Sequence, residues 1–269
     1  MDTSAMIRAN EVNWDARTPI HVASAFYAQE PAAWFAPHEW DDLGELTGRE
    51  VAHLQCHIGS ETKALAQRGA RVTGLDISGA SIEAARADSA GVEPAISYVR
   101  ADVFDAADAL GRERFDVVYT GKGALVFVPD VDKWAEQVAA LLRPGGFLYL
   151  VEFHPVLYTL GLIPTGEETL TVIDDYLPGR GAVAVDGTYT YTDGPTVPGS
   201  PGYFEWRHSL AEVVTALIGA GLRIDLLRET PEIPWKRWES MECVGGVWHR
   251  LPDSAPRLPL LYALRAVKS

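Results

Sequence analysis

Apolar residues recur along residues 51–154 in blocks of two alternating kinds. Five are short apolar runs of the sort that form buried strands: 51–56, 71–78, 96–103, 114–121 and 147–154. Helical segments separate several of them: 60–69, 81–91 and 131–146. In the last segment Trp134, Val138 and Leu141 fall on one face. Strands that alternate with helices at this spacing predict parallel βαβ units and an α/β, doubly wound sheet.

The pattern changes on either side of this stretch. Residues 1–45 are rich in Trp, His and Pro, and we expect short helices there, one of them around 20–27, forming an N-terminal cap. Residues 155–205 are rich in Gly, Pro, Thr and Tyr. That segment is too long for an ordinary connection and leaves the ligand edge of the sheet, so we expect a lid insertion. Within it, 183–193 resembles a hairpin or an edge strand.

The C-terminal part returns to regular elements. We expect a helix at 209–222 and strands at 223–229 and 258–267. A chain of 269 residues is long enough for one large α/β core and leaves little room for a second independent domain. We therefore interpret 1–269 as a single domain.

Composition narrows the possible partners. Lys and Arg number 23 against 37 Asp and Glu, which gives a formal net charge of −14. Such a chain repels nucleic-acid backbones and anionic lipid surfaces, so we expect no nucleic-acid or membrane partner. The N-terminus lacks a signal-peptide pattern, which favours a cytoplasmic location. The two cysteines indicate neither a disulfide framework nor a metal site.

Acidic residues stand at two strand ends where a doubly wound sheet binds its ligand. Asp76 ends the second strand, 17 residues after Gly59, and its carboxylate can accept two hydrogen bonds from a ribose diol. Asp102 ends the third strand, where it could accept from an adenine amino group beside the Val103 backbone. The structural alternatives are a helix N-cap for Asp76 and a loop cap for Asp102.

Four motifs, taken in order, resemble those of class I S-adenosylmethionine-dependent methyltransferases. They are Gly-Leu-Asp-Ile-Ser at strand two, Arg-Ala-Asp-Val at strand three, Phe-Asp-Val-Val in strand four and Leu-Arg-Pro-Gly-Gly before strand five. The resemblance implies a Rossmann-like seven-stranded sheet with an antiparallel last strand, and S-adenosylmethionine as cofactor without a metal. The cofactor-binding residues that it implies are Trp14, Gln55, Cys56, His57, Gly59, Asp76, Ile77, Asp102, Val103 and Gly121.

The loop after the first strand departs from that family. Its usual Gly-x-Gly-x-Gly positions hold Gln55, His57 and Gly59, and His53 replaces the usual acidic residue. The sequence is similar to a bacterial subgroup whose loop reads Leu-Gln-Cys-His-x-Gly, and whose N-terminal Trp-Asp, His and Tyr match Trp14, Asp15, His21 and Tyr27 here. We therefore expect a reshaped loop that still binds the cofactor.

The predicted function is methyl transfer to an oxygen or nitrogen of a small-molecule acceptor. When a base is needed, histidine suits the task near neutral pH, and we propose His154 first and His21 second. His154 could instead only bond the insertion to the sheet. Other readings are a cyclase or other non-methylating catalyst that binds the same cofactor, a non-catalytic binding protein, and a disfavoured dinucleotide dehydrogenase. A homodimer is left open.

Overall fold

A seven-stranded sheet forms the centre of the molecule in a computed structural model that describes residues 1–162, 166 and 169–269. The strand order is β3-β2-β1-β4-β5-β12-β8. The strands are β1 (Glu50–Leu54), β2 (Arg71–Asp76), β3 (Ser97–Arg100), β4 (Phe115–Thr120), β5 (Leu142–Phe153), β8 (Leu222–Thr230) and β12 (Leu261–Lys268). The first five are parallel, and β12 runs antiparallel to both β5 and β8. The predicted doubly wound sheet with an antiparallel last strand is confirmed.

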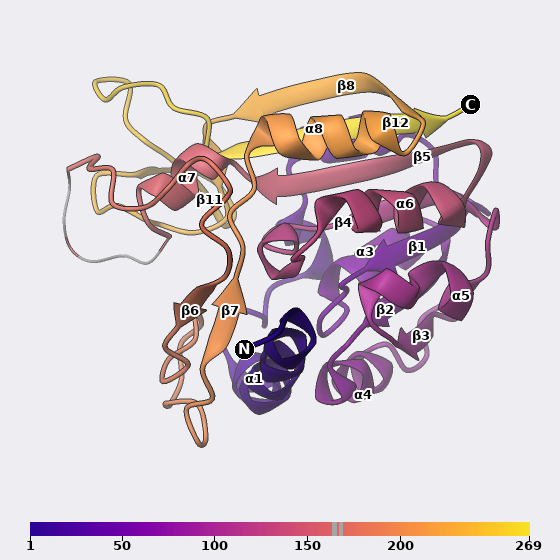
Figure 1. Cartoon of the computed structure of the whole chain (residues 1–269), viewed down its shortest axis with the longest axis horizontal. Coiled ribbons are helices and arrows are strands. Elements are labelled where there is room, and N and C mark those ends of the chain that lie inside the picture. The colour runs from indigo at the N-terminus through magenta and orange to yellow at the C-terminus, as the bar shows by residue number, and fades with distance from the viewer. Residues whose placement is uncertain (163–165, 167–168) are drawn as a thin grey trace.

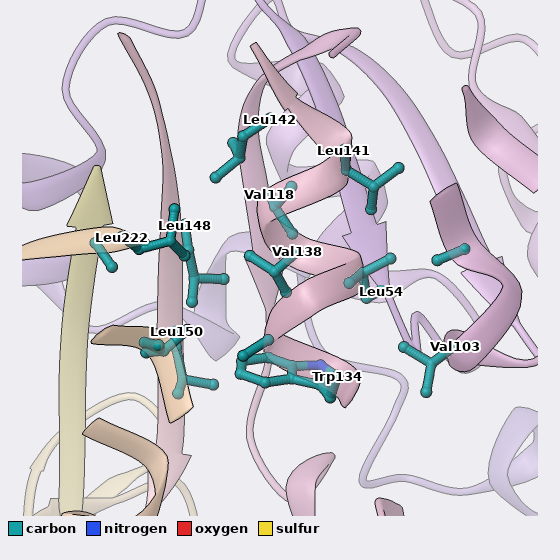
Figure 2. Close-up of a cluster of buried hydrophobic side chains, with 14 of the residues drawn as sticks. Leu54, Val103, Val118, Trp134, Val138, Leu141, Leu142, Leu148, Leu150 and Leu222 are labelled. Carbon is teal, nitrogen blue, oxygen red and sulfur yellow. The ribbon is translucent and has the colours of Figure 1, made fainter. Parts of the chain in front are cut away.

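Helices cover both faces of this sheet, so its central strands β1 and β4 are buried on both sides, whereas the edge strand β8 alternates between half-buried and exposed residues. They are α3 (Ser60–Gln67), α4 (Gly79–Asp88), α5 (Ala106–Leu110), α6 (Val131–Leu141) and α8 (Leu210–Gly219). Successive residues alternate between two cores: Val118 packs under α6 and α8, whereas Val117 packs under α3. Figure 2 shows Trp134, Val138 and Leu141 of α6 in the first of these cores.

The N-terminal segment forms one long helix instead of the expected short ones. Helix α1 (Thr3–Ala23) runs through Pro19 and is followed by η1 (Pro31–Trp34) and α2 (Pro37–Leu43). The expected helix over 20–27 is therefore wrong in its bounds. The buried face of α1 is largely polar, with Asn10, Asn13, Arg17 and His21 among its members, so a search for apolar periodicity could not find it.

The insertion packs against α1. It contains α7 (Pro155–Thr159) and the antiparallel pair β6 (Val183–Val185) and β7 (Tyr203–Glu205), and residues 163–165 and 167–168 lie outside the described residues. The Asn10 side-chain amide donates to the Phe204 carbonyl (2.8 Å) and accepts from the Phe204 N–H (2.7 Å). The Asn13 amide donates to the Pro201 carbonyl. These bonds tie α1 to β7, which lie side by side in Figure 1.

A small three-stranded sheet precedes β12 and was not expected. It consists of β9 (Glu232–Ile233), β10 (Glu242–Gly245) and β11 (Trp248–Arg250). Its Trp248 indole donates to the Ala33 carbonyl in η1, which ties this sheet to the N-terminal segment. None of the helices in the described part of the chain has the length and apolarity needed to span a membrane.

Candidate active site

A cleft opens at the carboxyl ends of β1, β2 and β4, under α1. It holds about 1010 Å³ of empty space, part of it open to solvent. Nine of the ten residues predicted to bind the cofactor line it: Trp14, Gln55, Cys56, His57, Asp76, Ile77, Asp102, Val103 and Gly121. The tenth, Gly59, is buried in the same loop, where an added Cβ would lie 2.6 Å from the Tyr98 hydroxyl oxygen. The structure thus brings the predicted set together.

The loop after β1 keeps a left-handed backbone at all three positions where glycine is usual. Gln55 has φ of 55°, His57 has 51° and Gly59 has 81°. Left-handed conformations cost non-glycine residues roughly 1 kcal/mol or more each. Contacts offset this cost, since the Gln55 amide donates to the Ala124 carbonyl (2.9 Å) and the His57 N–H donates to Asp76 (2.8 Å). The side chains differ from the usual loop, but its backbone turn is retained.

This loop leads directly into α3, and Gly59 stands at the N-cap position. Serine is a common cap, but Ser60 is the first residue of the helix here and does not cap it. Gly59 is required at this point because its φ is left-handed and because Tyr98 and Ala85 leave no room for a side chain.

Asp76 is held in place by backbone donors at the end of β2. Its Oδ2 accepts from the His57 N–H (2.8 Å) and its Oδ1 from the Ser78 N–H (2.9 Å). Burial raises the pKa of the Asp76 carboxyl to about 6. The alternative reading as a helix cap does not apply, because Ser78 caps α4. Each carboxylate oxygen keeps a further lone pair, so the fixed Asp76 can also accept from a diol in the cleft.

Asp102 is a loop cap that also lines the cleft. It caps η2 (Val103–Asp105) by accepting from the Phe104 N–H (3.0 Å), and it lines the cleft together with Val103. Ile7 and Asn10 of α1 line the same cleft. A ligand ring held between Asp102 and α1 would therefore contact both polar and apolar side-chain atoms.

Two histidines meet over the loop. His57 Nε2 lies 3.0 Å from His21 Nδ1, and His21 Nε2 lies 2.6 Å from the Thr190 hydroxyl in the insertion. Burial lowers the pKa of His21 to about 2 and that of His57 to about 3. Both rings are therefore neutral at neutral pH. His21, from α1, thus connects the loop to the insertion.

His154 does not line the cleft. Its Nε2 lies 2.9 Å from Glu229 Oε1, and its Nδ1 accepts from the Val156 N–H at the start of α7. The residue two positions earlier acts on the site indirectly: Glu152 accepts from the Gly123 and Leu125 N–H groups and so fixes the loop after β4, part of which lines the cleft. Burial raises the pKa of Glu152 to about 7. The sequence assigned Glu152 no role, because a single glutamate in a strand carries no recognisable signal.

Lys122 and Glu61 also line the cleft. Lys122 is buried, donates to the Trp34 carbonyl (2.9 Å), and lies 3.1 Å from Glu39 and 3.6 Å from Glu61. It therefore holds η1 to the cleft and is not a solvated loop lysine. Among the described residues, no group of three or more His, Cys, Asp or Glu side chains is placed to hold a metal ion.

Replacing His154 by alanine is expected to lower stability by about 1–2 kcal/mol, because the change removes the cap of α7 and leaves the Val156 N–H unpaired. Affinity for a ligand in the cleft should stay within a few-fold of the parent. Chemical denaturation and ligand titration of the same variant measure the two effects. A large loss of turnover without a loss of stability would restore His154 to the mechanism.

Comparison with known proteins agrees with the site. Residues 52–148 match the family model described as a methyltransferase domain. Among curated relatives, the ubiquinone biosynthesis O-methyltransferase of Alkalilimnicola ehrlichii is 33% identical over 135 residues, covering 46% of this chain and 54% of that protein. The Stutzerimonas stutzeri enzyme of the same name is 35% identical over 127 residues, covering 46% and 53%. The chain spans about half the length of these relatives.

Solved structures extend the likeness to most of the chain. An S-adenosylmethionine-dependent methyltransferase from Mesorhizobium loti superposes with a TM-score of 0.60 at 24% identity, covering 86% of this chain and 96% of that one. A putative one from Listeria monocytogenes gives 0.64 at 18% identity, covering 90% and 99%. The chain therefore has the fold of the S-adenosylmethionine-dependent methyltransferases, and its residues 52–148 match the methyltransferase domain model.

Proposed function

We propose that this protein transfers a methyl group from S-adenosylmethionine to an oxygen or nitrogen atom of a small molecule. The observation that carries the proposal is the geometry of the loop after β1. Every second residue of this loop, Gln55, His57 and Gly59, has a left-handed backbone conformation. The N–H of His57 donates to Asp76. A loop and an acid fixed to each other in this way are suited to a ligand that has both a nucleoside and a charged chain.

The residues present fit that cofactor. Asp76 would accept from the ribose hydroxyls, and Asp102 with Val103 would hold the adenine. Gln55, Cys56, His57 and Gly121 would line the amino-acid end, while Ile77 would pack on the nucleoside side. When bound, the cofactor supplies an electrophilic methyl group on a sulfonium, so the chemistry needs no metal.

The chain itself contributes positioning and exclusion of water. Trp14 of α1, Tyr27 and Tyr191 of the insertion line the cleft, and the rings of Tyr27 and Tyr191 are joined by a hydrogen bond between their hydroxyls. Aromatic faces favour a neighbouring cation, so these rings suit the sulfonium end of the cleft. The predicted role of residues 155–205 as a lid rests on Thr190, Tyr191 and β7, which reach the cleft or α1.

His57 and His21 would carry away the proton that an acceptor loses. In the tautomer in which His57 Nε2–H donates to His21 Nδ1, the Nδ1 lone pair of His57 can accept a proton, and His21 Nε2–H faces Thr190. Because burial keeps the pKa of both rings low, the proton does not stay on either ring. The pair would act as a path to the half-buried Thr190 hydroxyl, which would pass its own proton to solvent, so that His21 would relay the proton and not keep it as the predicted base.

Titration with cofactor tests this proposal. At 100 times its dissociation constant, S-adenosylhomocysteine or S-adenosylmethionine should stabilise the protein by roughly 2.7 kcal/mol, which thermal melts detect as a rise in Tm. NAD serves as the control ligand because it also carries adenosine. A rise in Tm with NAD, and none with either form of the cofactor, would overturn the proposal. With a pool of candidate acceptors, S-adenosylhomocysteine should accumulate.

A further inference from the structure

Arg17 is a buried guanidinium whose charge has no carboxylate beside it in the described part of the chain. The residue lies on the inner face of α1 and is 2% exposed. Its Nε and Nη2 are buried and have no hydrogen-bond partner among the described residues. Burying a charged group without a partner is costly, so buried arginines are normally paired. A cost of this kind at the edge of a binding cleft points to a ligand.

The two unpaired nitrogens form the edge of the guanidinium that binds a carboxylate in a bidentate manner. Elsewhere in this molecule the same edge binds a carboxylate in a bidentate manner in two ion pairs, Arg228 with Asp42 and Arg265 with Asp225. In a third, both nitrogens of Arg207 donate to one oxygen of Asp174. The other deeply buried arginine, Arg237, directs this edge at the backbone carbonyls of Gly161 and Leu160. Arg17 is at least as buried as these and lacks such a partner.

The position of Arg17 connects it to the cleft. Its guanidinium carbon lies 4.8 Å from the centre of the Trp14 ring, which lines the cleft, and 4.3 Å from the Tyr203 ring of β7. After burial, the charge of Arg17 is the next cause that lowers the pKa of His57, another cleft residue. A chain with a net charge of −14 repels anions at long range, so an anionic ligand needs a dedicated cation of this kind.

We propose that the Nε–Nη2 edge of Arg17 binds a carboxylate of a ligand in the cleft. The proposal rests on the proposed function, and two ligands can supply the group: the amino-acid end of the cofactor, or the acceptor. In the second case the acceptor is a carboxylic acid whose flat body packs among Trp14, Tyr27 and Tyr191. Because Arg17 is 2% exposed, binding requires the Trp14 ring or β7 to shift. The ligand whose carboxylate is bound by Arg17 would then contact both α1 and β7.

Three variants and two pairs of probes test the proposal. Arg17→Met removes the charge and keeps apolar packing, and Arg17→Lys keeps the charge and removes the bidentate edge. Arg8→Met is the control, because Arg8 is an exposed arginine on the same helix. Titration calorimetry compares S-adenosylhomocysteine with 5′-methylthioadenosine, which has the same nucleoside and no carboxylate. With S-adenosylhomocysteine saturating, benzoate is compared with its neutral match benzamide.

If the cofactor supplies the carboxylate, Arg17→Met and Arg17→Lys should each weaken the binding of S-adenosylhomocysteine at least tenfold. The affinity for 5′-methylthioadenosine should stay unchanged. If the acceptor supplies it, both nucleosides should bind as in the parent, and benzoate binding should fall at least tenfold while benzamide is unaffected. Either result supports the proposal. No change for any probe overturns it, as does an equal loss for both nucleosides with a lowered Tm, which marks a structural role. Failure of the parent to bind S-adenosylhomocysteine would instead count against the proposed function.

Discussion

Replacing Asp76 by alanine is expected to weaken S-adenosylhomocysteine binding by about two orders of magnitude, or roughly 2.7 kcal/mol. A carboxylate that accepts from two ribose hydroxyls makes charge-assisted hydrogen bonds, and each is worth about 1.5–3 kcal/mol. The same side chain also accepts from the His57 and Ser78 N–H groups. The variant therefore loses the ligand contact and also the anchor that keeps the loop after β1 in its left-handed conformation.

Asp102→Ala is the matched comparison, because Asp102 also lines the cleft and also accepts from a backbone N–H. It is expected to lose at most one hydrogen bond to the ligand and to weaken binding tenfold or less. Asp76→Asn keeps the side-chain volume but has a single acceptor oxygen, so its affinity should lie between those of Asp76→Ala and Asp102→Ala. Calorimetric titration well below each variant's Tm separates affinity from folding. Parent-like affinity in Asp76→Ala would show that the ribose is held elsewhere.

Acidification from pH 7.5 to 4 is expected to destabilise the protein by several kcal/mol. Burial lowers the pKa of His21 to about 2 and those of His53 and His57 to about 3, against 6.5 in an unfolded chain. Below pH 6.5 the unfolded state binds protons that the folded state does not, so stability falls with pH. Between pH 6.5 and 5 each of the three buried rings costs about 2 kcal/mol.

Carboxyl groups whose pKa is raised by burial oppose this trend, and they are Glu39, Asp76, Asp102 and Glu152. Burial raises the pKa of Asp76 to about 6 and that of Glu152 to about 7, so the folded state takes up their protons first and gains stability as pH falls. Their gain is smaller, because these pKa values are raised by less than those of the histidines are lowered. Denaturant titrations at a series of pH values measure the balance.

His53→Gln provides the control for that measurement. Glutamine can keep a hydrogen bond to the Thr62 hydroxyl, which lies 2.8 Å from His53 Nδ1, but it takes up no proton. The drop in unfolding free energy between pH 7.5 and 5 should therefore shrink by about 2 kcal/mol. Stability that stays constant or rises on acidification of the parent would contradict the expectation.

The central sheet could be predicted because its strands are buried on both faces and its helices show an apolar stripe. Strands β1 to β4 were placed within three residues, as was the start of α6, whose Trp134 and Val138 mark its inner face. The end of that helix was wrong, because residues 142–146 belong to β5 and not to α6. Helix α1 was not, because its inner face carries Asn10, Asn13, Arg17 and His21. Polar side chains on a buried face leave no hydrophobic period, so the helix could be recognised only together with β7, to which it bonds.

The site shows the same limit. Strand-end residues such as Asp76 and Asp102 follow from topology alone, and the structure places them in the cleft. Gln55 and His57 could be placed only by alignment with the glycines that they replace, and their left-handed φ values follow from tertiary contacts. Glu61 and Glu152 were given no role in the site, and Lys122 was weighed equally as a site residue and as a solvated loop lysine, because each acts through a partner distant in sequence. His154 was proposed from its strand-end position, and its side chain turns to Glu229 instead.

The place of β12 in the sheet has a consequence for how the polypeptide acquires its structure during synthesis. In this sheet β8 is bonded to β12, and β12 separates it from β5. When only residues 1–260 of the chain have been synthesised, β12 is missing. The outer edge of β5 is then unpaired, and β8 has no strand in the sheet to pair with. Exposed strand edges invite pairing with other chains, so the interval before residues 261–268 emerge is when a nascent chain is most exposed to aggregation.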